Sequence, residues 1–152
     1  MNNFERSLVP LLVREFEKRQ PIFQVLTGPR QVGKTTIAQQ VMDKLPFPFV
    51  YASADSPLPP GPEWIETQWR RAEVEADRSG CAVLLVLDEV QKVRGWSESL
   101  KSKWDAARRM SRDIRLLVTG IIGAADSDRV IGKPDRTILS ASLQPLDVSG
   151  MR

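Results

Sequence analysis

The chain has 152 residues, of which 41% are hydrophobic and 27% are charged. This length and composition are typical of one globular domain. One cysteine and no histidine exclude an intramolecular disulfide, the common zinc sites and every mechanism that needs an imidazole. The longest apolar run, 81–87, is far shorter than the roughly 20 residues of a membrane-spanning helix, and no signal peptide is recognisable. We therefore expect a cytoplasmic protein without a membrane span, whose chemistry depends on carboxylates, lysine, arginine, hydroxyls and backbone amides.

The net charge of +3 is unevenly distributed along the chain. Segment 92–115 holds eight basic and three acidic residues, a local excess of five. Such a segment is either a solvated helix face or a surface for nucleic-acid phosphates. The basic residues are not interleaved with aromatic ones as in RNA-binding modules, so the sequence favours the solvated face. We expect at most weak, non-specific nucleic-acid binding. The basic residues are Lys92, Arg94, Lys101, Lys103, Arg108, Arg109, Arg112 and Arg115.

Hydrophobic periodicity predicts strands that alternate with helices. The first segment, 4–19, has apolar residues at helical spacing, and Pro10 is predicted to kink that helix or to restart it. The proline-rich segment 56–62 is predicted to be a stiff extended loop. The expected order is then strand 22–27, helix 35–44, strand 47–52, helix 63–79, strand 81–87, helix 97–110, strand 114–119 and a last strand over 137–143.

This alternation predicts βαβ crossovers and therefore an α/β fold, a three-layer sandwich around a mostly parallel five-stranded sheet. The unbroken apolar run 81–87 is typical of a strand that is buried on both faces. Four tryptophans lie at helical spacing, where core or interface packing is more common than stacking on a nucleobase. Ligands of such sheets bind at the carboxyl ends of the strands.

Residues 28–35, GPRQVGKT, match the phosphate-binding loop G-x-x-x-x-G-K-[ST] between a predicted strand and a predicted helix. Glycines let such a loop curl so that its amides and the following helix N-terminus surround a polyphosphate. Lys34 would bridge the β- and γ-phosphates, and the Thr35 hydroxyl would ligate Mg²⁺. A chance match in such a chain has a probability of about half a percent. The residues expected to contact nucleotide are Gly28, Pro29, Arg30, Gln31, Val32, Gly33, Lys34, Thr35 and Thr36.

Two carboxylates, Asp88 and Glu89, follow the strand over 81–87. At a strand end Asp88 can hold the Mg²⁺ shell and Glu89 can polarise an attacking water. Thr119 ends the next predicted strand, where it would lie between the carboxylates and the γ-phosphate. A plain turn-initiating Thr-Gly fits that spacing almost as well.

The sequences GPRQVGKTT at 28–36 and LDEVQKVRGWSESLKSKWD at 87–105 resemble the AAA-type ATP-binding proteins of bacteria and archaea, which usually carry a C-terminal domain of unknown function. The resemblance covers about 4–120. It implies the additional-strand branch of the P-loop NTPases, in which another strand separates the acidic strand from the loop strand. By this resemblance, Lys34 and Thr35 are the functional pair of the phosphate-binding loop, and Asp88 and Glu89 form the family's second motif. Thr119 is then the sensor, and Arg136 is the arginine before the final strand.

The chain also departs from the family. Ile121 and Ile122 stand where relatives have serines after the sensor, and the segment that leads to Arg136 is shortened. The chain ends where the family continues into lid-like and C-terminal regions. We therefore expect a helical lead-in over 1–20 and an ATPase core over 21–152 that lacks a lid, with slow turnover.

These features predict Mg²⁺-dependent binding of ATP and ADP, with slow hydrolysis of ATP. The alternative is a non-catalytic, nucleotide-dependent module that contacts a protein or a nucleic acid, or that self-associates. A P-loop kinase fits less well, because the tandem carboxylates favour activation of water and no lid arginines follow.

Overall fold

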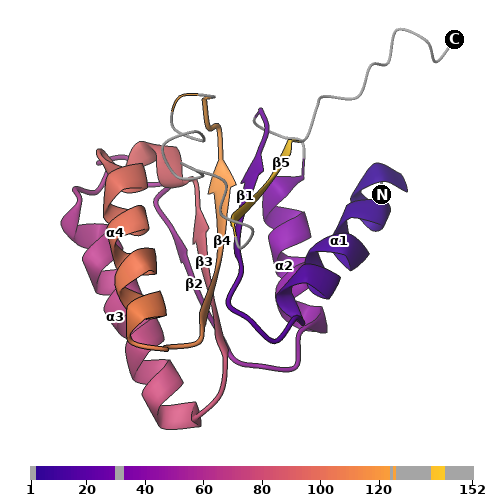
Figure 1. Ribbon diagram of the computed structural model, residues 1–152. Helices are drawn as coiled ribbons and strands as arrows, with labels where there is room; N and C mark the ends of the chain where they lie inside the picture. The colour runs from indigo at the N-terminus through magenta and orange to yellow at the C-terminus, as the bar shows by residue number, and fades with distance from the viewer. Residues whose placement is uncertain (1–2, 30–32, 124, 126–137, 143–152) are drawn as a thin grey trace, which may run out of the picture.

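The computed structural model describes residues 3–29, 33–123, 125 and 138–142. Helices and strands alternate as the sequence predicts (Figure 1). In chain order the elements are α1 (Asn3–Phe16), β1 (Phe23–Thr27), α2 (Lys34–Lys44), β2 (Phe49–Ser53), α3 (Glu63–Ser79), β3 (Val83–Asp88), the short 3₁₀ helix η1 (Val90–Lys92), α4 (Trp96–Arg109), β4 (Ile114–Gly120) and β5 (Ile138–Ser142).

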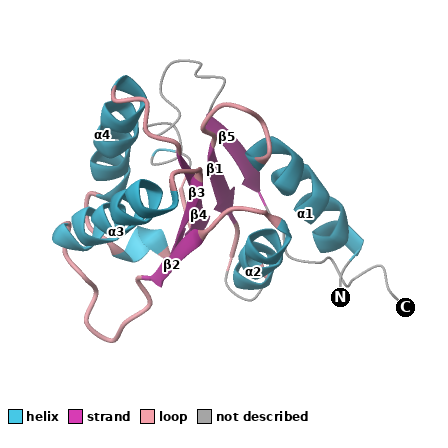
Figure 2. Ribbon diagram, turned by 90° about the horizontal axis from the view of Figure 1, so that it is seen from below, coloured by secondary structure: helices cyan, strands magenta, loops and turns pink. Residues whose placement is uncertain are grey.

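The five strands form one sheet in the order β2-β3-β4-β1-β5, and each neighbouring pair is parallel. Helices α1 and α2 cover one face and α3 and α4 cover the other, which gives the expected three-layer sandwich (Figure 2). Strand β4 separates the acidic strand β3 from β1, the strand that leads into the phosphate-binding loop. This is the order that the family resemblance implies.

Strand β3 joins the two halves of the core. All six of its residues are buried, as its unbroken apolar sequence predicts. Leu85 packs in the cluster beneath α3 and α4, and Leu84 packs in the cluster beneath α1 and α2. Burial of each such side chain stabilises the fold by about 1.5–3 kcal/mol. The central strands are therefore a rigid base for the residues at their carboxyl ends.

The tryptophans belong to the core and not to a stacking surface. Trp69, Trp96 and Trp104 are buried, and Trp64 packs half-buried against the same cluster. The Trp104 and Phe23 rings pack edge to face, with 5.5 Å between ring centroids. Edge-to-face contacts of this kind add to the free energy gained from burial alone.

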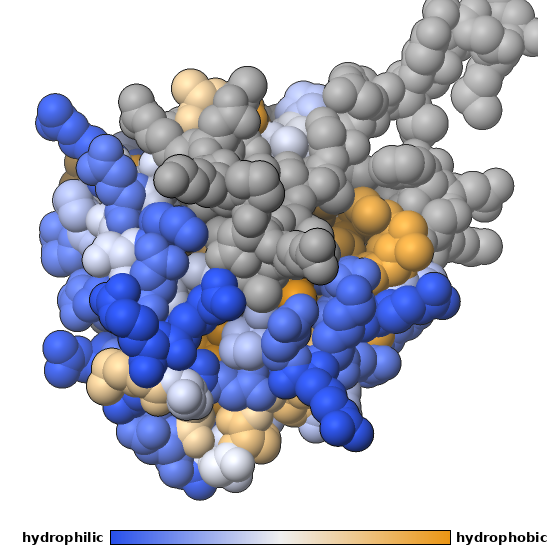
Figure 3. Space-filling model, viewed as in Figure 1, coloured by the Kyte–Doolittle hydropathy of each residue, from blue (hydrophilic) through white to orange (hydrophobic). Residues whose placement is uncertain are grey.

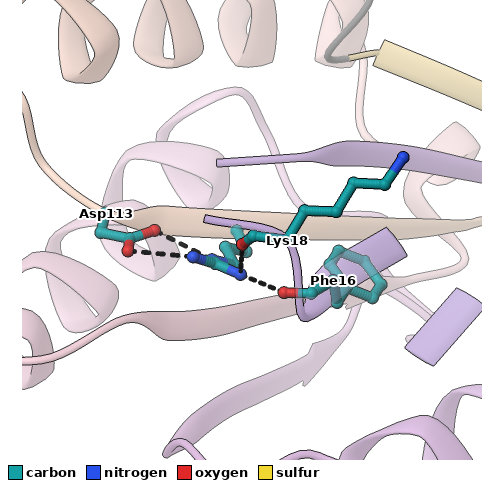
Figure 4. Close-up of polar contacts among 4 residues, drawn as sticks. Phe16, Lys18 and Asp113 are labelled. Carbon is teal, nitrogen blue, oxygen red and sulfur yellow. Dashed lines mark hydrogen bonds and ion pairs between the residues drawn. The ribbon is translucent and has the colours of Figure 1, made fainter. Parts of the chain in front are cut away.

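Helix α1 continues through Pro10, so the predicted restart is wrong. Pro10 is exposed, and water can therefore satisfy the carbonyl that loses its helical partner. The helix ends at Phe16, where the buried Arg115 guanidinium donates to the carbonyl oxygens of Phe16 and Lys18 and pairs with Asp113 (Figure 4). Arg115 thus satisfies backbone carbonyls at the end of α1 and attaches that helix to the start of β4.

The remaining differences lie at element ends. Strand β3 begins at Val83, so Cys81, which the apolar run places within the strand, is exposed in the turn after α3. Gly80 adopts a left-handed conformation there (φ 68°) and ends α3. No helix within the described part of the chain is long and apolar enough to cross a membrane.

Candidate functional site

Those predicted site residues that the structure describes lie where the carboxyl ends of β1, β3 and β4 meet the N-terminus of α2. Gly28 and Pro29 leave β1, and Gly33 precedes α2 with φ 89°, a left-handed conformation that glycine adopts at little cost. The Gly33 carbonyl accepts the first helical bond, from the Ile37 amide at 2.9 Å. Arg30, Gln31 and Val32 lie outside the described residues.

Lys34 is buried at the start of α2, with 4% of its surface exposed. Its ammonium donates to the carbonyl oxygens of Gly28 at 2.8 Å and Pro29 at 2.7 Å. A buried ammonium needs such acceptors, because its charge is costly away from water. The contacts fix a positive charge beside the first two residues of the loop.

Asp88 is the centre of a hydrogen-bond cluster at the end of β3. Its Oδ2 accepts from the Thr35 hydroxyl at 2.9 Å and from the Tyr51 hydroxyl at 2.8 Å, and its Oδ1 accepts from the Thr119 hydroxyl. Asp88 is 3% exposed and Thr119 is fully buried. The structure therefore brings Thr35, Asp88 and Thr119, which the sequence singles out separately, into direct contact.

The oxygen atoms of this cluster suit Mg²⁺. Because the Thr35 hydroxyl donates its hydrogen bond to Asp88, its oxygen lone pairs can face a cation, and the Asp88 carboxylate adds negative charge. Among the described residues, no group of three or more acidic, cysteine or histidine side chains could hold a metal alone. Magnesium sites with one or two protein oxygens are completed by water and substrate phosphates, which fits this pair.

Tyr51 in β2 is a site residue that the sequence analysis missed. Burial, the hydrogen bond to Asp88 and the Asp88 charge raise the pKa of Tyr51 to about 12, so its hydroxyl remains a donor at neutral pH. The order of the strands could have indicated Tyr51, because β2 pairs in parallel with β3 and Ser53 lies opposite Asp88. Polar side chains near the end of β2 therefore lie beside the acidic pair.

Glu89 lies differently from Asp88. It has a left-handed backbone (φ 56°, ψ 40°), a conformation that costs a non-glycine residue roughly 1–2 kcal/mol, and its side chain is half-buried. Its Oε2 accepts a hydrogen bond of 2.6 Å from Gln91 Nε2. Local strain of this kind is common at functional sites.

The segment after β4 is attached to the end of β1. The Thr27 hydroxyl donates to the Ile122 carbonyl at 3.0 Å and accepts from the Ile122 amide at 3.1 Å. Ile121 is 45% exposed, and Thr36 on α2 is exposed. Arg136 lies outside the described residues.

The basic segment 92–115 is largely neutralised by acidic partners. At least five of its eight basic side chains form ion pairs with described residues, and Arg115 is buried. The face over α4 is mostly hydrophilic (Figure 3), which agrees with the solvated-face interpretation. The pairs are Lys92 with Asp55, Lys101 with Asp105, Lys103 with Glu66, Arg112 with Glu73, and Arg115 with Asp113.

A parallel α/β sandwich with a glycine-rich loop before a helix, beside a buried aspartate, defines a P-loop-type nucleotide-binding protein. The family model of the AAA domain matches residues 20–149, so the chain belongs to the AAA-domain family and is a nucleotide-binding, ATPase-like core.

The other comparisons concern the fold. No curated protein matches the chain. Among solved structures, that of C. elegans PCH-2 aligns with 96% of this chain at a TM-score of 0.60 and 18% identity. The chain spans 44% of the length of that protein. At this identity the similarity shows the shared fold.

Proposed function

We propose that this chain binds ATP together with Mg²⁺ and hydrolyses it slowly to ADP and inorganic phosphate. The observation that supports this most strongly is the hydrogen bond between Thr35 and Asp88, because it unites the phosphate-binding loop with the acidic strand. The family match supports the nucleotide-binding part of this proposal. We also propose a cytoplasmic, prokaryotic setting, which rests on the resemblance of the sequence to bacterial and archaeal ATP-binding proteins.

Nucleotide binding depends on the loop and on Lys34. The backbone amides of the phosphate-binding loop, residues 28–36, would bind the phosphates, and the N-terminus of α2 adds positive potential. The Lys34 ammonium is anchored on the carbonyls of Gly28 and Pro29, and from there it would contact the β- and γ-phosphates. The anchored lysine is preorganised, so little side-chain entropy is lost when it meets the nucleotide.

Thr35 and Asp88 are the residues that hold Mg²⁺. Held by these two residues, Mg²⁺ would supply positive charge against the phosphate oxygens. Thr119 and Tyr51 hold the Asp88 carboxylate by hydrogen bonds to its two oxygens, so the carboxylate is oriented from both neighbouring strands.

Glu89 orients the attacking water and accepts its proton. The bond from the water oxygen to the γ-phosphorus forms while the bond from that phosphorus to the β-phosphate oxygen breaks, which releases ADP and phosphate. Arg136 is the candidate for stabilising the transferred group, and this role rests on the family resemblance. An arginine in this role commonly contributes on the order of 10³ or more to the rate.

Product analysis tests the proposal against its two rivals. Purified chain is incubated with Mg²⁺ and radiolabelled ATP, and Lys34→Ala prepared identically controls for contaminating ATPases. We expect free phosphate at a rate well below the order of 10 per second of ordinary enzymes. Binding without product would instead establish a non-catalytic module, and a labelled acceptor would establish a kinase. A rate per chain that rises with protein concentration would indicate an arginine from a neighbouring copy.

A further inference from the structure

Gln91 contacts Glu89 and has no role in the motifs described above. It lies in η1, directly after the acidic pair, and its Nε2 donates to Glu89 Oε2 over 2.6 Å. The left-handed backbone of Glu89 turns the chain between them, so donor and acceptor meet only two residues apart. The bond occupies one oxygen of the Glu89 carboxylate and leaves the other available to a water molecule.

The other end of the Gln91 carboxamide points toward strand β4. Its Oε1 is buried and has no hydrogen-bond partner among the described residues. A Cβ atom on Gly120 would lie 2.1 Å from this oxygen, so glycine at that position makes room for the carboxamide. Exchanging its oxygen and nitrogen would bring two oxygen atoms face to face at Glu89.

A buried carbonyl oxygen without a partner is unfavourable. The orientation of Gln91 is therefore explained by the bond to Glu89 and not by the needs of its own oxygen. A glutamate side chain has several rotatable bonds, and a fixed hydrogen bond restricts the positions of its carboxylate. Reaction rates depend steeply on such positioning.

We infer that Gln91 is a positioning residue for Glu89: its carboxamide lies against Gly120 at the end of β4 and holds the Glu89 carboxylate from there. The inference rests on the proposed hydrolysis. It implies that one strand end orients both carboxylates: Thr119 bonds Asp88 directly, and the next residue, Gly120, accommodates the side chain that bonds Glu89.

The first test is Gln91→Ala, with Gln39→Ala on the exposed face of α2 as the matched control. We expect kcat for phosphate release to fall by about 10- to 100-fold in Gln91→Ala, as for a misplaced catalytic group. KM and the Kd for ATP should stay unchanged, because Gln91 contacts none of the proposed phosphate or metal ligands. The thermal midpoint should change little, since the lost Nε2 hydrogen bond to Glu89 is offset by the removal of the buried Oε1, which has no partner among the described residues.

Gly120→Ala tests the geometry without altering either partner. Its Cβ would displace the Gln91 carboxamide and should reproduce the loss of kcat, although the φ of +158° at Gly120 also makes alanine strained there. In the Gln91→Ala background this backbone strain remains but the displaced group is gone, so the further loss should be smaller than in the wild-type background. Full additivity of the two losses would contradict the inference. Thermal unfolding of both variants distinguishes misfolding from mispositioning.

A readout independent of turnover is the NMR signal of the Gln91 side-chain amide. It should be protected from solvent exchange and should lose that protection in Glu89→Ala. The inference is overturned if Gln91→Ala leaves kcat unchanged or raises it, or lowers kcat and ATP affinity alike. A wild-type chain that binds ATP without turnover would overturn the proposed hydrolysis and the catalytic role of this contact, while the amide signal would still report whether the contact exists.

Discussion

The hydroxyl of Thr35, at the start of α2, donates a 2.9 Å hydrogen bond to Asp88 Oδ2 at the end of β3, 53 residues further along the chain. This bond joins the phosphate-binding loop to the acidic strand across the intervening strand β4. Because Asp88 is also bonded by Tyr51 and Thr119, the carboxylate is fixed by three hydroxyl groups. The proposed magnesium ligands are thus held in place by the protein itself.

We predict that Asp88→Asn weakens the magnesium dependence of ATP binding. The amide loses the negative charge, and its NH₂ group would face a hydroxyl that now donates to the carboxylate. Calorimetric titrations with and without Mg²⁺ should show that the gain in affinity from Mg²⁺ falls about tenfold or more. Asp43→Asn, exposed on α2, is the control. An unchanged gain would show that Asp88 does not hold the ion.

Glu89→Gln should leave ATP binding intact and remove turnover. The amide cannot accept a proton from the attacking water, and loss of a general base commonly costs 10²–10⁴, on the order of 3–5 kcal/mol in activation free energy. Phosphate release under saturating Mg²⁺-ATP measures the effect. Glu98→Gln, an exposed glutamate on α4, should keep the wild-type rate. If Glu89→Gln also keeps the wild-type rate, Glu89 is not the base that accepts the proton of the attacking water.

The Tyr51 phenol should ionise near pH 12. Tyr51 is the single tyrosine of the chain, so phenolate absorbance reports on it alone. Burial, the Asp88 hydrogen bond and the Asp88 charge raise its pKa to about 12, from the ordinary value of 10.0. In Asp88→Asn the titration should shift toward the ordinary value. If the Tyr51 phenol of the folded wild type ionised at the ordinary pKa, this result would contradict its hydrogen bond to Asp88.

The same shift has a consequence for stability. The pKa of Tyr51 is higher in the folded than in the unfolded chain. The stabilising contribution of the protonated Tyr51 to the free energy of unfolding is therefore fully present below pH 10.0 and is lost as pH rises toward about 12. Tyr51→Phe should therefore reduce the alkaline loss of unfolding free energy. Denaturant unfolding of both proteins across this pH window measures the difference.

Arg115→Met should destabilise the fold by about 2–4 kcal/mol, because it removes the donors of a buried charged network. The carbonyls of Phe16 and Lys18 and the carboxylate of Asp113 would lose their partner. Urea unfolding measures the change, and Arg94→Met on an exposed position is the control. Equal stability of the two variants would show that Arg115 does not attach α1 to β4.

Much of the architecture was predictable because the strands are apolar and the turns are marked. The buried run that ends at Asp88 gave a central parallel strand, and the helix Glu63–Ser79 has the predicted limits, since Gly80 ends it with a left-handed conformation. Pairing in register then brings Thr35, Asp88 and Thr119 to one edge of the sheet.

Contacts that depend on side-chain reach were not predictable from the sequence. The sequence predicts Tyr51 only as a strand residue. The pairing of β2 with β3 is what shows that its hydroxyl can contact Asp88. The Gln91 bond depends on the backbone turn at Glu89, which periodicity does not reveal. Whether the helix could continue through Pro10 depended on which side of α1 faces solvent.

The most direct test of the central claim is a calorimetric titration of the chain with Mg²⁺-ATP, compared with Lys34→Ala. The account predicts saturable binding by the wild type and an affinity lower by on the order of 100-fold in the variant, because the phosphates lose the anchored ammonium. Lys44→Ala, an exposed lysine at the other end of α2, should bind as the wild type does. Equal affinity of the wild type and Lys34→Ala, or no binding by the wild type, would contradict the assignment of this site.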